Sequence, residues 1–160
     1  MTSKDELIKL FNDSASDREK GKQMEADNIK EFQDETRKLF IQMREWLDGT
    51  PVEIERNKTP IHDDTTNVRT YPMDTMAIFN AGKRMELRPT TLYLMGSTGE
   101  IEIKFTGISR RNLQYSLYMK DSFSGENEPG IWSLVNTSNR QSERTPLTKE
   151  VFYSLISNLT

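Results

Sequence analysis

The strongest constraint on the fold is a regular stripe of residues in the region 22–48. Its spacing alternates between four and three residues, through Glu25, Ile29, Phe32, Thr36, Leu39, Met43 and Trp46. That alternation is typical of an amphipathic helix with heptad character, because every member returns to one face. The pattern covers roughly 27 residues, or about 40 Å at 1.5 Å per residue. A compact domain of 160 residues has a radius of gyration of about 15 Å. We therefore expect a helix that crosses the whole body or projects from it.

The two ends of this helix carry different signals. At its C-terminal end, residues 48–51 (Asp-Gly-Thr-Pro) combine a Gly suited to the left-handed cap with a following Pro, which indicates a stop. Towards the N-terminus, Ser3 followed by two acidic residues is typical of a helix start, and 7–11 add a short apolar stripe. The polar run 12–17 competes for backbone hydrogen bonds, so we expect a break there, with Gly21 as a second weak point. The sequence thus predicts a short helix and a long one, together forming an arm of residues 1–48.

From residue 49 to the end at residue 160 the pattern changes to a sheet domain. Val52 and Ile54 alternate with acidic residues as in an edge strand, and 56–70 is polar and predicted to be a long loop. Period-two alternation then predicts strands at 76–79, 84–88, 91–95, 100–106, 113–120 and 131–136. Pro89 is expected to end the second of these, and Pro146 to begin a C-terminal helix with a purely apolar stripe. The fold class is α+β: helical arm, antiparallel meander of five to six strands, and a C-terminal helix packed on the sheet.

Composition excludes several classes of site. The chain has 160 residues, no Cys, one His and a formal net charge of −3. Without Cys there is no disulfide framework, thiolate nucleophile or Cys-based metal site. No apolar run approaches the ~20 residues of a membrane span, and the first residues are charged where a signal peptide would be apolar. We expect a cytoplasmic protein that has no contact with membranes.

The sequence His62-Asp63-Asp64 is the one place where a His adjoins carboxylates. A carboxylate could orient the imidazole as a general base, or the group could hold a divalent metal. However, adjacent residues cannot all point at one ion without special backbone geometry. We therefore interpret this segment as part of a solvated loop and expect no cofactor and no metal.

The helical stripe has two interpretations. Its large apolar side chains could pack on the protein's own sheet, or they could pair with a second copy or another protein. Hydrophobic residues make up 34% of the chain, which leaves little surplus core to cover a 40 Å helix. This shortfall favours a partner-binding role for Ile29, Phe32, Leu39, Phe40, Met43 and Trp46.

Basic residues on the predicted strands support an alternative. Mixed with aromatic residues on an open sheet face, they could bind single-stranded nucleic acid by phosphate contact and base stacking. The candidates are Arg84, Arg88, Lys104, Arg110, Arg111 and Tyr118. Glu86, Glu100 and Glu102 interrupt this patch, and the pI of about 5.3 is low for a nucleic-acid-binding domain.

No catalytic constellation emerges from these residues. We therefore expect a non-enzymatic interaction protein of the adaptor or chaperone-like kind. It would self-associate through its long helix as a homodimer or higher oligomer, or bind another protein there. Single-stranded nucleic-acid binding is the alternative.

Overall fold

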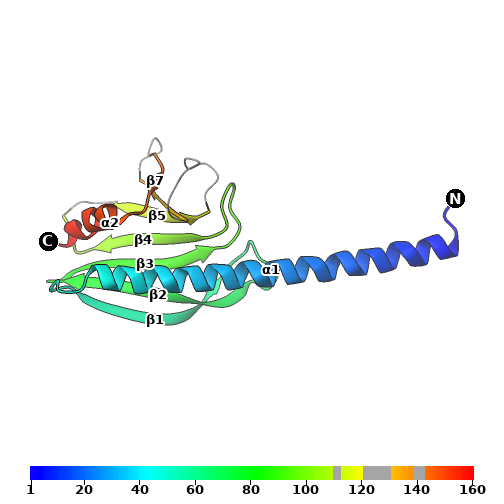
Figure 1. The fold of residues 1–160 in the computed structure, drawn as a ribbon, viewed down its shortest axis with the longest axis horizontal. Helices are drawn as coiled ribbons and strands as arrows, with labels where there is room; N and C mark the ends of the chain where they lie inside the picture. Colours follow the sequence, from blue (N-terminus) through cyan, green and yellow to red (C-terminus); the bar gives the residue numbers. More distant parts are fainter. Residues whose placement is uncertain (110–112, 121–130, 139–142) are drawn as a thin grey trace.

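The computed structural model describes residues 1–109, 113–120, 131–138 and 143–160. These residues form an α+β fold in which one long helix lies across an antiparallel sheet and extends far beyond it (Figure 1). The elements in chain order are α1 (Lys4–Trp46), β1 (Glu53–His62), β2 (Thr70–Asn80), β3 (Lys83–Thr91), β4 (Glu100–Thr106), β5 (Gln114–Met119), β6 (Trp132–Asn136), β7 (Thr145–Pro146), α2 (Lys149–Ile156) and the 3-10 turn Ser157–Leu159.

Helix α1 is a single element of 43 residues, so the predicted break at 12–17 was wrong. Its length is about 65 Å at 1.5 Å per residue. The start was predicted correctly: the Ser3 hydroxyl accepts from the Glu6 amide, and the Glu6 carboxylate accepts from the Ser3 amide. Extending an existing helix costs far less than nucleating one. Because no Pro interrupts the arm, the polar run and Gly21 stay helical.

The sheet is a simple meander with strand order β1 to β7, and every neighbouring pair is antiparallel. The described residues therefore give seven strands where five to six were expected. One apolar face of the sheet receives the C-terminal half of α1, and α2 packs beside it. The rings of Trp46 and Phe152 meet with centroids 5.5 Å apart, so the two helices and the sheet share one core.

The stretch 56–70, predicted as a long loop, is mostly strand. β1 continues to His62 and β2 begins at Thr70, which leaves a connection of only residues 63–69. β1 lies at the edge of the sheet, where alternate residues face solvent and where a Pro such as Pro60 costs no ladder hydrogen bond. A polar composition is therefore compatible with a strand at this position.

Two predictions based on Pro were also wrong. Pro89 does not end β3, which continues to Thr91 with a register irregularity opposite β4, while 92–99 form the connection instead of a strand. Pro146 does not begin the C-terminal helix. It belongs to the short strand β7, and the Thr148 hydroxyl caps α2 by accepting from the Val151 amide.

Gly99, the residue before β4, lies close to the Phe32 ring of α1. Its φ is +145°, and a Cβ built there would lie 2.7 Å from Cδ1 of the Phe32 ring. We expect Gly99→Ala to lower the free energy of unfolding by about 1–3 kcal/mol more than Gly82→Ala. Gly82 also has a positive φ, but its added Cβ would meet nothing within 4 Å. Urea unfolding of both variants measures the difference, and equal losses would show that the ring does not need this space.

Candidate interaction surfaces

The stripe residues predicted to bind a partner lie in the chain's own core. Five are buried between α1 and the sheet, and the sixth, Trp46, is half-buried against Phe152. The five are Ile29, Phe32, Leu39, Phe40 and Met43. In this fold the sheet covers them, so a partner would have to displace the sheet to reach them.

The N-terminal half of α1 has no such cover. Every residue up to Met24 is exposed, and Glu25 is the first to be buried. The segment 4–24 therefore overhangs the body by roughly 30 Å. From here on, the name arm refers to this segment alone and no longer to residues 1–48. Figure 1 shows it running straight out beyond the ends of the strands. An overhanging helix is available on all sides to another molecule.

Four large apolar side chains gather at the end of the arm, within little more than one helical turn. Their exposed fractions are 46% for Leu7, 48% for Ile8, 59% for Leu10 and 67% for Phe11. We call this cluster the arm tip. A single exposed Leu is ordinary, but a contiguous exposed cluster is typical of a binding surface. Each such side chain gains ~1.5–3 kcal/mol when a neighbour removes it fully from water.

The arm tip points to the same side of the helix as the buried stripe. Residues 18 apart are separated by five full turns and share one direction. Leu7 therefore lies in line with Glu25 and Met43, and Phe11 lies in line with Ile29. The apolar line that packs on the sheet thus reappears at the tip, beyond the reach of the sheet.

Polar contacts fix the direction of the arm where it leaves the body. The buried Glu25 carboxylate accepts from the Asn67 amide at 2.8 Å, which ties α1 to the 63–69 connection. Each partner in this contact has an exposed apolar neighbour in the sequence, Met24 at 65% and Val68 at 56%. We call these two residues the arm base.

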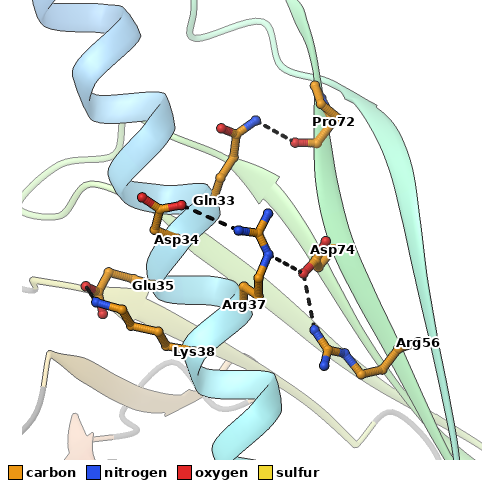
Figure 2. A network of polar contacts seen from close by, with 8 residues as sticks. All are labelled: Gln33, Asp34, Glu35, Arg37, Lys38, Arg56, Pro72 and Asp74. Atoms are coloured by element: carbon orange, nitrogen blue, oxygen red, sulfur yellow. Dashed lines mark hydrogen bonds and ion pairs between the residues drawn. The ribbon is translucent and has the colours of Figure 1, made fainter.

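About three turns beyond Glu25 along α1, Asp74 on β2 is shared by two guanidinium groups (Figure 2). Its carboxylate lies 3.4 Å from Nε of Arg37 on α1 and 3.3 Å from Nη2 of Arg56 on β1. Beside it, the Gln33 side chain donates to the Pro72 carbonyl at 2.9 Å. These contacts pin the helix to β1 and β2, so the arm leaves the body in a defined direction.

The His62-Asp63-Asp64 segment does not form one site. His62 Nε2 lies 2.8 Å from an Asp64 carboxylate oxygen on the exposed surface. Asp63 is instead fully buried and organises the connection around it: its carboxylate accepts from the Thr65 amide and hydroxyl, the Tyr71 hydroxyl and the Leu92 amide. Within the described part of the chain, no three His, Cys, Asp or Glu side chains are grouped so that they could hold a metal.

The role of Asp63 was not predicted from the sequence. Burial raises the pKa of its carboxyl, but the hydrogen bonds that it accepts outweigh burial and hold the pKa below its ordinary value. Burial and the neighbouring Asp63 raise the pKa of the Tyr71 hydroxyl, which stays a donor. An Asp side chain in a polar connection commonly accepts from the backbone amide two residues further on, as Asp63 does from Thr65, and this is the signal that indicates such a turn.

Four of the predicted nucleic-acid residues are described by the structure, and each lies on the open face of the sheet beside or opposite an acidic residue. Arg84 is paired with Glu86 at 2.7 Å, and its guanidinium lies 4.6 Å from the centre of the Phe79 ring. Across the ladder, Lys104 is opposite Glu86 and Arg88 is opposite Glu102. These two cross-strand pairs line a groove of about 380 Å³ with mixed charge, to which Thr59 and His62 also contribute.

On β5, the Tyr118 ring has its centre 5.1 Å from the Arg144 guanidinium. Tyr118 is opposite Glu100 on β4. The pKa of the Tyr118 hydroxyl is raised, mainly by burial and to a lesser extent by the charge of the Glu100 carboxylate. Arg110 and Arg111 lie outside the described residues. The structure therefore brings the basic residues that it describes together, but it places carboxylates among them.

Comparisons with models of protein families, with curated protein sequences and with solved structures find no match for this chain. Among the helices that the structure describes, none combines the length and the apolar character needed to cross a membrane. The exposed apolar residues described above therefore define the candidate interaction site, which consists of the arm, the arm tip and the arm base.

We expect Asp63→Asn to lower the free energy of unfolding at about pH 7 by ~1–3 kcal/mol, because an amide cannot accept all of these hydrogen bonds. A carboxyl with a depressed pKa stabilises the fold above its ordinary pKa of 3.8, and that contribution is lost as pH falls through the folded-state value. The deficit of the variant should therefore shrink towards about pH 2. Urea unfolding across this range measures it.

Asp64→Asn provides the matched control, because the exposed Asp64 carboxylate pairs with His62 on the surface. It should change stability by less than ~0.5 kcal/mol at either pH. A deficit for Asp63→Asn that is constant with pH would contradict the role assigned to this carboxylate.

Proposed function

We propose that this protein is a non-enzymatic, cytoplasmic interaction protein that binds another polypeptide through the arm tip. The observation that carries the proposal is a cluster of four exposed apolar side chains on an overhanging helix with a firmly anchored base. An amphipathic helix that lays its apolar face against a complementary surface is a recurring mode of protein recognition. The absence of Cys agrees with a reducing compartment.

The geometry of the arm favours a macromolecular partner over a small molecule. Small ligands require concave sites that enclose most of their surface. The arm tip is convex and exposed on all sides, so only a partner with a surface of its own can cover it. Rigid anchoring lowers the entropy lost on binding, because the helix is already formed and directed.

The nucleic-acid alternative has weaker support from the described residues. Phosphate binding needs cations whose charge is not already balanced. Arg84, Arg88 and Lys104 each have a glutamate beside them or directly across the ladder. We therefore place protein binding through the arm first.

A photoreactive phenylalanine analogue at Leu10 should cross-link the protein to another polypeptide, either a second copy or a different protein, in an extract of the cells that naturally make it. Leu7→Glu combined with Phe11→Glu should lower the cross-linking yield by about tenfold or more, because burying carboxylates in an apolar contact is costly. The urea midpoint should not change, since these side chains are exposed and contribute nothing to the core.

The same analogue at Lys58, an exposed position on β1, serves as the control and should give little cross-linking. A tip that cross-links no more than this strand position would contradict the proposal.

A further inference from the structure

We propose that the partner of the arm is an acidic amphipathic helix of another protein, which packs along the side of the arm that carries Leu7, Phe11 and Arg18. This inference rests on the proposed function and states the chemistry of the partner. It follows from the charges and the spacing of the arm residues that share the direction of the buried stripe.

The spacing of the buried stripe continues through the arm to its tip. Residues 18 apart share one direction, so Arg18 is aligned with the buried Thr36, and Lys22 is aligned with the buried Phe40. We call the arm residues that are aligned with buried stripe residues the seam. They are Leu7, Phe11, Ser14, Arg18, Gly21 and Lys22. From Leu7 to Gly21 their spacing alternates between four and three residues, which is the spacing of helices that pack against another helix.

The charged groups of the seam lack strong partners of their own. Among the described residues, Arg18 forms no ion pair, and Lys22 forms one at 3.6 Å with Glu19. Both members of that pair are about three-quarters exposed, and such a surface pair contributes little to stability. A helix packed on the seam would take the Arg18 guanidinium partly out of water. A guanidinium in that position needs a carboxylate beside it.

The acidic residues of the arm point away from the seam. Each of them is aligned with a residue 18 positions further on that the sheet does not bury. These acidic residues are Asp5, Glu6, Asp13, Asp17 and Glu19. The charged residues aligned with the buried stripe are instead all cationic, because Lys4 lies five turns before Lys22 and shares its direction. A complementary surface therefore combines apolar side chains with carboxylates.

A second copy of this chain does not offer such a surface. Its seam carries the same cations, so two seams packed together would bring Arg18 and Lys22 of both copies into one interface without carboxylates. Like charges across an interface oppose association. The 63–69 connection also closes the seam at the body, because Asn67 contacts Glu25 there. The free part from Leu7 to Lys22 is about 22 Å long, which suits a partner helix of roughly 15 residues.

The shape of the site favours a rod-shaped partner over an anionic membrane or a nucleic acid. The buried stripe faces the sheet, so the sheet lies on the side towards which the seam points, and the arm extends beyond it (Figure 1). A flat bilayer would meet the sheet before it reached Lys22. A partner helix can lie along the seam in the layer that the sheet occupies further along α1. A phosphate backbone has no apolar surface to cover Leu7 and Phe11.

Two synthetic helices test the charge of the partner. Each has about three heptads with Leu at the a and d positions, and the flanking e and g positions are Glu in one peptide and Lys in the other. The protein should bind the Glu peptide at least about tenfold more tightly, as measured by fluorescence anisotropy. Its net charge of −3 acts in the opposite direction, so this preference would report a local cationic surface. Equal binding, binding of neither peptide or preference for the Lys peptide would overturn the inference.

A charge swap assigns the binding to the seam. Arg18→Glu combined with Lys22→Glu should reverse the preference to the Lys peptide, and this reversal would also show that the arm stays helical. Lys9→Glu combined with Lys20→Glu is the matched control, because it changes the net charge equally at residues aligned with the exposed Asp27 and Lys38. The control should keep the preference for the Glu peptide. Equal effects of the two double variants would contradict the assignment to the seam.

The photoreactive analogue at Leu10 separates this inference from the proposed function. The segment that it cross-links, identified by mass spectrometry, should be acidic and carry apolar residues at three- and four-residue spacings. Cross-linking to a second copy, or to a segment without carboxylates, would overturn the inference and leave the proposed function standing. Cross-linking to nucleic acid or lipid alone, or to nothing, would contradict both.

Discussion

The packing of α1 on the apolar face of the sheet is the interaction on which the rest of this structure depends. An antiparallel meander with one solvent-exposed face needs other elements to cover its apolar face. The eight-residue helix α2 is too short to cover that face alone. Phe32, Phe40 and Met43 supply the cover from α1 and are completely buried. Each such side chain contributes ~1.5–3 kcal/mol through burial, so the meander and the helix stabilise each other.

The same packing creates the overhang. Strands of 7–11 residues span at most about 37 Å, whereas α1 is about 65 Å long. Because the C-terminal half is fixed over the sheet, and Glu25 and Arg37 hold it laterally, the N-terminal half has to extend beyond the body. A single helix thus has two parts with different roles. One part completes the core, and the other exposes an apolar tip that the core cannot reach.

Several elements could be predicted because they depend on local pattern. The stripe of α1, the Ser3 cap, the strand Glu100–Thr106 and the apolar helix near the C-terminus all follow from spacing and capping chemistry. The wrong predictions concern segments whose secondary structure depends on contacts with residues remote in the sequence. β1 is polar and was predicted to be loop beyond Glu55, but pairing with β2 along its whole length makes it a strand. The continuity of α1 depends likewise on a nucleated, anchored second half.

For the candidate site, the sequence by itself determined that a long amphipathic helix exists and which face of it is apolar. It could not determine which part of that face is covered. The tertiary structure decided this, because the length of the strands sets where burial stops: Phe32 is inside and Phe11 is outside, although both lie on the same side of the helix. The physical reason is that periodicity depends on neighbours along the chain, whereas burial depends on the distance to strands that are remote in sequence.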